Sequence, residues 1–344
     1  MIEVLKEGLL LVPSGNVFDH CGVLNPAVII ADGYTHVFYR AVGTTNHSTI
    51  GYCKLLGASD IVERHERPLL FPQFDYECQG MEDPRIVKID DLYYLTYTAY
   101  DGVNASGALA VSTDLVHFEK KGQITPEFTY DEFILLAETK DKINSKYLRY
   151  NDTRDTVNVF GKKLFIWDKN VIFFPRRVNG KLVFLHRIRP DIQIVSIERL
   201  EDLTVEFWQH YFLHLDDHIV LAPKYDHEVS YIGGGCPPIA TVQGWLMIYH
   251  GVHDTVNGYV YSACAAMLDL DEPQKEISRL PYPLFVPQSD WEMTGVVNNV
   301  CFPTGAIVIA DRLFIYYGAA DDKIAFASVS LSGLIQELML YITK

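Results

Sequence analysis

Basic residues are scarce in this chain. Only 29 lysines and arginines stand against 44 aspartates and glutamates, which gives a formal net charge of -15 at pH 7. Proteins that bind nucleic acid need a basic surface to neutralise phosphates, so this balance argues against a nucleic-acid partner. Hydrophobic residues make up 49% of the chain and charged residues 21%. A soluble protein with a sizeable core is therefore expected.

Paired cysteines, long apolar runs and targeting signals are also lacking. The six cysteines are scattered with no Cys-x-x-Cys pair, so we expect reduced thiols and no metal site. No apolar run is long enough to cross a membrane. The first residues, Met-Ile-Glu-Val-Leu-Lys-Glu-Gly, show neither the basic nor the apolar part of a signal peptide. The sequence predicts a cytoplasmic protein with no membrane partner.

An internal repeat is the clearest feature that the chain does contain. A proline-containing segment, a short strand, a polar turn and an aromatic strand follow one another, and a further strand of small and apolar residues comes after them. The copies begin at Asn25-Pro26, Asp83-Pro84, Phe174-Pro175, Pro237-Pro238 and Phe302-Pro303. Repeated short strands of this kind are typical of propeller blades, whereas a β-sandwich would not explain the repeat. We predict an all-β fold, a five-bladed β-propeller.

Residues 1–344 are predicted to form a single propeller domain with one long insertion. This insertion lies between the second and third copies, at about 122–169, and its middle, 131–150, has a mixed pattern that could include a helix. Such a segment is often a lid, a partner surface or a substrate-facing loop. The C-terminal segment 331–344 is expected to pack on the propeller as a helix or a strand.

Charged residues cluster at the start of the second copy, where Glu82, Asp83 and Arg85 lie beside a proline. Unpaired charges there would be costly, so they need partners or a function. An isolated cluster would be explained best by a structural ion pair. In a propeller, however, equivalent positions of all blades converge on a central funnel. The candidate substrate-binding residues at such positions are Asn25, Arg40, Asp83, Arg85, Tyr100, Asp101, Arg176, Arg187, His250 and Asp321.

Acids, arginines and aromatic rings around a funnel suit a small oligosaccharide. Aromatic faces stack on sugar rings, and charged side chains hydrogen-bond hydroxyl groups. Inverting cleavage of a glycosidic bond needs a carboxylic acid and either a second carboxylate that activates water or an anion that attacks directly. The structural alternatives are salt bridges between blades for Arg40 and Arg187, and a core position for Tyr249.

Several longer segments carry a family resemblance. They are 80–85 (Gly-Met-Glu-Asp-Pro-Arg), 174–176, 185–187, 232–238 (Ile-Gly-Gly-Gly-Cys-Pro-Pro), 244–251, 257–262 and 316–321. In these segments, which span nearly the whole chain in the same order, the sequence resembles glycoside hydrolase family 130, the mannoside phosphorylases and related β-1,2-mannosidases. The resemblance implies a five-bladed propeller, in agreement with the repeat.

The resemblance also implies roles for the matching positions. Asp83 would be the general acid, which protonates the glycosidic oxygen through a sugar hydroxyl. Asn25, Arg40 and Asp321 would hold the mannose in the cleavage subsite. The residues that match the region where phosphorylases bind phosphate are Arg176, Arg187, His250 and Tyr261.

One position departs from the phosphorylase pattern. Where phosphorylases carry a lysine before the glycine-rich segment, this chain has Tyr231, and losing a cation weakens a phosphate site. Glu228 lies in the same stretch, where a carboxylate would repel phosphate and could instead deprotonate a water. Arg176 and Arg187 are retained, however, and Glu228 could equally be a surface partner of Lys224 or His227.

On balance the sequence favours an inverting, metal-independent glycosidase that cleaves β-mannosides, with Asp83 as acid and Glu228 as base. The alternative is a β-mannoside phosphorylase that releases mannose 1-phosphate, with inorganic phosphate as co-substrate and no cofactor. A non-catalytic carbohydrate-binding propeller is the third interpretation. The linkage, the leaving-group sugar and the oligomeric state, a homo-oligomer included, are left open.

Overall fold

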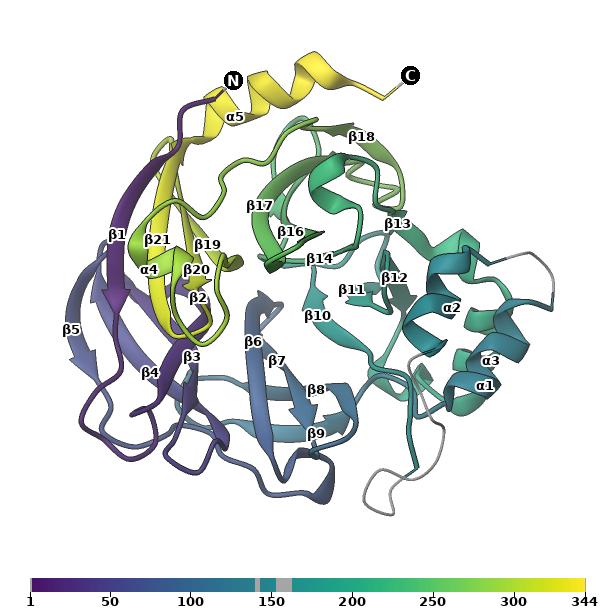
Figure 1. Cartoon of the computed structure of the whole chain (residues 1–344), viewed down its shortest axis with the longest axis horizontal. Coiled ribbons are helices and arrows are strands. Elements are labelled where there is room, and N and C mark those ends of the chain that lie inside the picture. The colour runs from purple at the N-terminus through teal and green to yellow at the C-terminus, as the bar shows by residue number, and fades with distance from the viewer. Residues whose placement is uncertain (1, 140–142, 153–162, 344) are drawn as a thin grey trace.

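The computed structural model describes residues 2–139, 143–152 and 163–343 of the chain (Figure 1). Strands recur from Leu5 to Ser330, and the helices between them are short. The prediction of an all-β fold is therefore confirmed. None of the helices in the described ranges combines the length and the apolar character that crossing a bilayer requires.

The first sheet contains eight strands and divides into two halves. Its order is β2-β3-β4-β6-β7-β8-β9, with β5 paired to β4. A single parallel pair, Ser48 with Gly80, joins β4 to β6, whereas the other neighbours are antiparallel. Two four-stranded units result, β2–β5 and β6–β9. Their strands are β2 (Gly22–Ala31), β3 (Tyr34–Val42), β4 (Ser48–Leu56), β5 (Asp60–Arg64), β6 (Gly80–Ile89), β7 (Leu92–Tyr100), β8 (Ala105–Ser112) and β9 (Glu119–Gln123).

The remaining strands form three further sheets, with orders β10-β11-β12-β13, β14-β16-β17-β18 and β1-β21-β20-β19. In the last of these, the N-terminal strand pairs with β21, so the two ends of the chain share one sheet. The strands are β1 (Leu5–Leu11), β10 (Lys169–Phe173), β11 (Leu182–Arg187), β12 (Ile192–Ile197), β13 (Ile219–Leu221), β14 (Tyr231–Gly234), β15 (Ile239–Ala240), β16 (Trp245–Thr255), β17 (Gly258–Leu268), β18 (Glu276–Arg279), β19 (Cys301–Ile309), β20 (Arg312–Ala319) and β21 (Lys323–Ser330).

The sheets are arranged around a common centre, with β6, β10 and β14 among the strands that lie nearest to it (Figure 1). The first, second and fifth predicted repeats correspond to the first two strands of a unit, namely β2 with β3, β6 with β7 and β19 with β20. The third and fourth predicted repeats begin at Phe174 and Pro237, after the first strands β10 and β14 of their units. That these units are the five blades of a propeller stays a prediction at this point.

Polar turns join these strand pairs, as the sequence predicted. Asp32 and Gly33 have φ values of 50° and 81°, and Asn179 and Gly180 have 50° and 79°. Two-residue hairpin turns require positive φ because only then does the turn match the twist of its strands. Aspartate, asparagine and glycine adopt this conformation at little steric cost.

Within its described residues, the insertion after β9 includes the helices α1 (Tyr130–Ala137) and α2 (Ser145–Asp152). The helix expected within 131–150 is therefore present. The hydroxyl of Thr129 accepts a hydrogen bond from the amide of Glu132, and the Glu132 carboxylate accepts one from the Thr129 amide. This reciprocal cap satisfies backbone donors that the first turn of a helix leaves unpaired.

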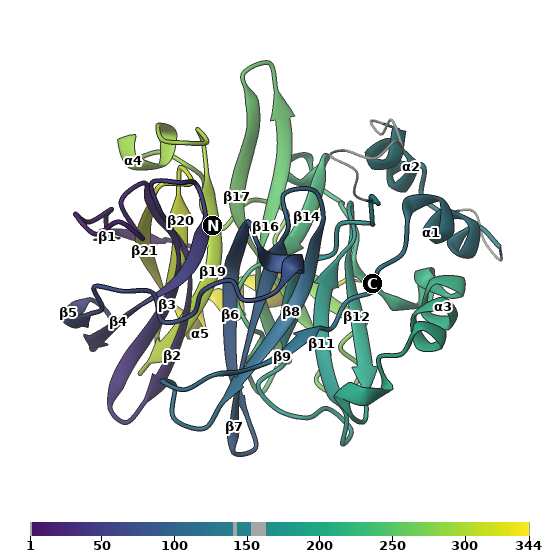
Figure 2. The same ribbon diagram turned by 90° about the horizontal axis from the view of Figure 1, so that it is seen from below.

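Helices α1 and α2 share an apolar core with α3 (Val205–Leu213) and the sheet of β10–β12. Phe133 of α1, Tyr147 of α2 and Phe212 of α3 are all buried in this core. Figures 1 and 2 show the three helices together on one side of the molecule. At the C-terminus, α5 (Leu331–Leu338) packs on the sheets through a shared apolar core. The sequence had left a helix or a strand open for this segment, and the structure shows a helix. The other helices in the described ranges are η1 (Asp75–Glu77), η3 (Leu200–Asp202), η4 (Leu215–His218), η5 (Asp226–Glu228), α4 (Asp290–Met293) and η6 (Met339–Tyr341).

A buried carboxylate precedes the first strand of each four-stranded unit. In most units it accepts a hydrogen bond from a tyrosine of the second strand and pairs with a cation of the outer strand. We call these carboxylate–ring units, and they are Asp19–Tyr39–Arg64, Glu77–Tyr97–Lys120, Glu228–Tyr249–Arg279 and Glu292–Tyr317–Lys6. In the β10–β13 sheet, Asp168 instead contacts the ring of His186 at 2.8 Å. These carboxylates are 0% exposed, and a buried charge persists only where it is paired.

Candidate active site

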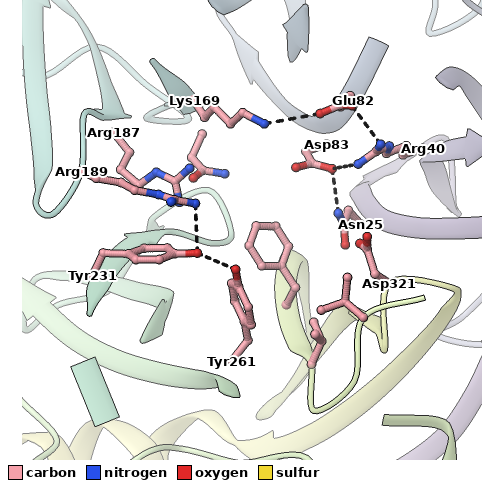
Figure 3. Close-up of a pocket in the computed structure, with 14 residues that line it drawn as sticks. Asn25, Arg40, Glu82, Asp83, Lys169, Arg187, Arg189, Tyr231, Tyr261 and Asp321 are labelled. Carbon is pink, nitrogen blue, oxygen red and sulfur yellow. Dashed lines mark hydrogen bonds and ion pairs between the residues drawn. The ribbon is translucent and has the colours of Figure 1, made fainter. Parts of the chain in front are cut away.

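Bulges in the first strands turn polar side chains toward the centre. The pairing register shifts between Leu24 and Ala27 and between Glu82 and Arg85, and again in β10. At these bulges Asn25, Asp83 and Asn170 have φ values of 51°, 49° and 55°. Asparagine and aspartate tolerate this left-handed conformation best among residues with a Cβ, and bulges often re-aim a side chain at a functional site. The three side chains line one pocket (Figure 3).

This pocket has about 660 Å³ of empty volume and is rich in charge. Figure 3 shows an acidic side, with Asp83, Glu82 and Asp321, facing a cationic side with Arg187 and Arg189. Apolar side chains close a third side. The lining residues are Asn25, Arg40, Glu82, Asp83, Lys169, Asn170, Arg187, Arg189, Tyr231, Tyr261, Val297, Val300, Phe302 and Asp321.

Asp83 is held by an amide and a guanidinium on the acidic side. Its Oδ1 accepts a hydrogen bond from Asn25 Nδ2 at 2.7 Å and lies 3.6 Å from Arg40 Nη1. Burial acts to raise the pKa of Asp83, but Arg40, Lys169 and the Asn25 hydrogen bond outweigh it, and the pKa lies below its usual range. Asp83 is therefore ionised at neutral pH in this arrangement.

Two further carboxylates lie around the same guanidinium. Arg40 Nη2 donates to Glu82 Oε1 at 2.9 Å, and Lys169 Nζ lies 3.5 Å from Glu82 Oε2. Burial raises the pKa of Asp321 despite the opposing field of Arg40, and the negative charges of Asp83 and Glu82 raise it further. The acidic side thus holds carboxylates with different proton affinities, which is an arrangement suited to proton transfer.

On the cationic side, Arg189 Nη2 donates to the hydroxyl of Tyr231 at 3.0 Å, and its guanidinium lies 3.9 Å from the centre of the Tyr231 ring. The Tyr231 hydroxyl in turn lies 2.5 Å from that of Tyr261. Burial lowers the pKa of Arg187 to about 10, and the neighbouring Arg189 lowers it as well. Arg187 Nε is buried with no hydrogen-bond partner among the described residues. A buried and a half-buried guanidinium in one pocket suit an anionic ligand.

Most of the predicted site residues come together here. Those that line the pocket are Asn25, Arg40, Asp83, Arg187, Tyr231, Tyr261 and Asp321. Two others lie directly behind it. His250 is 0% exposed and stacks 4.4 Å from Phe302, and burial followed by the charge of Arg187 lowers its pKa well below the usual value. Arg85 donates to the backbone carbonyls of Asp83 and Pro84 at 2.9 and 3.0 Å, which fixes the bulge.

Tyr100 and Asp101 are not among the described residues that line the pocket. The Tyr100 hydroxyl donates to the carbonyl of Gly102 at 2.8 Å. Asp101 Oδ1 accepts from the amides of Val103 and Asn104 at 2.8 and 2.6 Å. Both side chains therefore organise the turn that follows β7.

Arg176 also falls outside the described lining. It is exposed in the turn after β10, with its guanidinium 4.8 Å from the ring of Trp245. The sequence repeat had aligned Pro175 with Pro84, but the pairing register aligns differently. In the β10–β11 pair, Lys169 lies opposite Arg187, and in the β6–β7 pair, Glu82 lies opposite Thr98 at the same point of the sheet. The residue that follows Lys169, Asn170, is therefore the structural equivalent of Asp83, which follows Glu82.

Glu228 is likewise absent from the described lining, and its carboxylate is 0% exposed. Oε2 accepts from the amides of Lys224 and Tyr225 at 2.8 and 3.2 Å and from Arg279 at 3.2 Å, while Oε1 accepts from the Tyr249 hydroxyl. Glu228 is thus the acid of one of the carboxylate–ring units. The sequence-based hypothesis that it activates a water has no support from this placement.

Sequence reasoning missed several residues of the pocket. Glu82 was noted only as part of a charged cluster, and Lys169, Asn170 and Arg189 were not assigned. Asn170 could have been found if the repeats had been aligned on the Asn or Asp at the bulge, as in Asn25-Pro26 and Asp83-Pro84, rather than on the proline that follows it. Lys169 directly precedes Asn170, and Arg189 follows the assigned Arg187 by two residues, but no sequence motif identifies either of them as a site residue.

One cluster of potential metal ligands occurs in the described part of the chain: His227, Glu228 and Cys264, with ligand atoms within 4.8 Å of one another. Both oxygens of Glu228 already accept hydrogen bonds, and the Arg279 guanidinium would repel a cation. The cluster is better explained by packing than by metal binding.

Comparison with known proteins identifies the family. A family model described as "beta-1,4-mannooligosaccharide phosphorylase" matches residues 14–158 and 144–340. A 1,2-β-oligomannan phosphorylase of Thermoanaerobacter sp. (strain X514) is 30% identical over 97% of this chain and 98% of its own length. A β-1,2-mannobiose phosphorylase of the same strain is 33% identical over 89% of each chain.

A solved structure shows the same fold. The β-1,2-mannobiose phosphorylase from Listeria innocua, in complex with β-1,2-mannobiose, superposes with a TM-score of 0.73 and 22% identity over 98% of this chain and 99% of that one. The sequence-based identification is therefore confirmed, and the chain belongs to glycoside hydrolase family 130.

Proposed function

We propose that the chain is an inverting β-mannoside phosphorylase that acts on β-1,2-linked mannosides. A phosphate oxygen forms a bond to C1 of the mannosyl unit while the bond from C1 to the departing sugar oxygen breaks. The departing oxygen takes up a proton, and mannose 1-phosphate leaves with inverted configuration. The observation that carries this proposal is the pair of arginines, buried Arg187 and half-buried Arg189, opposite Asp83 in one pocket.

The arginine side would hold the phosphate. Arg187 and Arg189 present two guanidinium groups, which bind phosphate oxygens in a bidentate manner. Asn170 lines the same pocket, and the Nδ2 of its amide can donate a hydrogen bond to a phosphate oxygen. Tyr231 occupies the position where the resemblance implies a lysine, and Arg189 lies against the Tyr231 ring. Arg189, in the segment after β11, would thus supply the positive charge that the lysine would otherwise supply from β14.

Asp83 would deliver the proton, and the resemblance implies that it does so through a sugar hydroxyl. Its pKa is low because Arg40, Lys169 and Asn25 stabilise the carboxylate against the effect of burial. A phosphate anion bound at the arginines would offset this field and raise the pKa of Asp83, because a nearby negative charge disfavours ionisation. Phosphate binding would therefore prepare the acid as well as supply the nucleophile.

Sequence reasoning favoured hydrolysis, and two observations support the phosphorylase alternative instead. Glu228, the intended base, is buried in a carboxylate–ring unit with both oxygens occupied. Both curated relatives described above carry phosphorylase names. Their names also support the β-1,2 linkage, and inorganic phosphate would be the co-substrate.

The recurring strand units also support a proposal about the fold. We propose that the five units of four or five strands, which begin with β2, β6, β10, β14 and β19, are the blades of a single propeller domain. The first strands of four units, β2, β6, β10 and β19, carry a register shift, and carboxylate–ring units recur in all but the β10–β13 sheet, where Asp168 contacts His186 instead. Pairing of β1 with β21 would close the ring by joining the two ends of the chain.

The test is product analysis. The protein is incubated with β-1,2-mannobiose and with β-1,4-mannobiose, with and without inorganic phosphate, and the products are separated. Mannose 1-phosphate formed from the β-1,2 substrate only when phosphate is present is the expected result. Free mannose at equal rates in both conditions would overturn the proposal in favour of hydrolysis. No product from either disaccharide, together with binding of mannobiose, would favour a non-catalytic sugar-binding protein.

A further inference from the structure

The two pocket arginines are separated by a single residue, Ile188, whose backbone is held by one side chain. Gln193 Oε1 accepts a hydrogen bond from the Ile188 amide at 2.8 Å, and Gln193 Nε2 donates to the Ile188 carbonyl at 2.8 Å. Gln193 is 0% exposed. Both backbone groups between Arg187 and Arg189 are thus fixed by one buried amide.

The helical insertion completes this arrangement. Gln193 Nε2 also donates to the hydroxyl of Tyr147 at 2.9 Å, and that hydroxyl donates to Asp191 Oδ2 at 2.8 Å. Tyr147 lies on α2 and is 1% exposed, and Asp191 is 1% exposed. The tyrosine therefore orients the amide that holds Ile188, and it is the hydrogen-bond donor to a buried carboxylate two residues beyond Arg189.

We infer that Tyr147 is a positioning residue for the anion-binding arginines, and that the α1–α2 insertion thereby sets the affinity for phosphate; this inference rests on the proposed function. The hydrogen bonds of Tyr147 go to Gln193 and Asp191, so it acts on the arginines through these two residues. Lys146, its neighbour on α2, donates to the carbonyl of Val229 at 2.9 Å, which joins the insertion to the segment before Tyr231 as well.

The arginines need such support because their charges repel each other. The charge of Arg189 lowers the pKa of Arg187, after the larger effect of burial. A flexible segment would let the side chains separate, whereas preorganised cations bind an anion without that reorganisation. Removing the Tyr147 hydroxyl would take away the hydrogen bond to Oδ2 of Asp191. The other carboxylate oxygen, Oδ1, is buried and already has no hydrogen-bond partner among the described atoms. The segment from 187 to 191 would then loosen, while Asp83 and Asn25 would stay in place.

The test compares Tyr147→Phe with a matched control, Tyr282→Phe. Tyr282 donates to the Glu337 carboxylate of α5, so the control removes the same kind of bond far from the arginines. Tyr147→Phe should raise KM for phosphate, and the phosphate Kd measured by calorimetry, roughly five- to tenfold, as expected for a lost buried hydrogen bond. KM for mannobiose should change no more than in the control. Gln193→Met should raise KM for phosphate at least as much.

Two outcomes would overturn the inference. An unchanged KM for phosphate in Tyr147→Phe, with a raised one in Gln193→Met, would show that the amide holds the segment without the tyrosine. Equal rises in KM for phosphate and mannobiose would show a general structural defect. If the wild-type protein neither binds phosphate nor consumes it, the proposed function fails first, and the inference falls with it.

Discussion

The hydroxyl of Tyr249 donates a hydrogen bond to the buried carboxylate of Glu228. The equivalent tyrosines in two other sheets, Tyr97 and Tyr317, donate to Glu77 and Glu292 in the same way. Each of these glutamates also accepts a hydrogen bond at 2.8 Å from the backbone amide four residues earlier. A side chain whose environment recurs this closely in three sheets serves the architecture that the sheets share.

Glu228→Gln should therefore reduce stability and leave the chemistry intact. Glutamine keeps the volume but leaves the Arg279 guanidinium without its charged partner, so the free energy of unfolding should fall by about 1–3 kcal/mol. Glu77→Gln is the matched control, because Glu77 makes the same contacts beside Lys120 in another sheet. Both variants should show lower melting temperatures and similar kcat for phosphorolysis. A loss of turnover confined to Glu228→Gln, in protein that is fully folded, would restore its catalytic role.

Site residues could be predicted from the sequence where the backbone conformation at the site itself restricts the residue type. Asn25 and Asp83 precede prolines at bulges that require positive φ, so their residue type, their neighbour and their direction could all be predicted together. Asn170 adopts the same conformation before a valine, and the proline-based alignment passed over it in favour of Arg176.

Side chains whose roles depend on distant partners could not be predicted in the same way. Arg189 enters the pocket because it lies against Tyr231, more than forty residues away in the chain. Glu228 lies in the predicted stretch, but whether its carboxylate faces the pocket or the core depends on Tyr249 and Arg279. Such contacts are set by how the sheets pack together, which no local pattern encodes.

Arg187→Met should weaken phosphate binding selectively. Methionine keeps much of the apolar stem but removes the guanidinium, whose Nε is buried without a protein partner among the described residues. We expect KM for phosphate to rise at least tenfold, since a charge-assisted hydrogen bond contributes more than about 1.5 kcal/mol. Arg176→Met is the matched control, because Arg176 packs on Trp245 outside the described lining of the pocket. Equal effects of the two substitutions on KM for phosphate would contradict this assignment.

Asp83→Asn should lose turnover while keeping affinity for mannobiose. Asparagine tolerates the φ of 49°, and its amide oxygen can still accept the hydrogen bond from Asn25. Removing a general acid typically reduces the rate by about 10²–10⁴-fold. The loss should be much smaller with a p-nitrophenyl β-mannoside, whose leaving group needs no proton. A variant that cleaves mannobiose at the wild-type rate would show that Asp83 is not the acid.

The carboxylate–ring units should also make stability depend on pH. Burial acts to raise the pKa of Glu292, but hydrogen bonds from Lys6 and Tyr317 outweigh it, and the pKa is lowered on folding. A lowered pKa contributes stability above the unfolded-state value of about 4.3, and this contribution is lost as the pH falls through the folded-state pKa. The melting temperature of Glu292→Gln should therefore lie below that of the wild type at pH 7, and the difference should shrink below about pH 4. Glu63→Gln removes an exposed ion pair with Lys54 and is the control, with little difference expected at either pH. A difference for Glu292→Gln that stays constant from pH 7 to pH 3 would mean that its ionised carboxylate does not stabilise the fold.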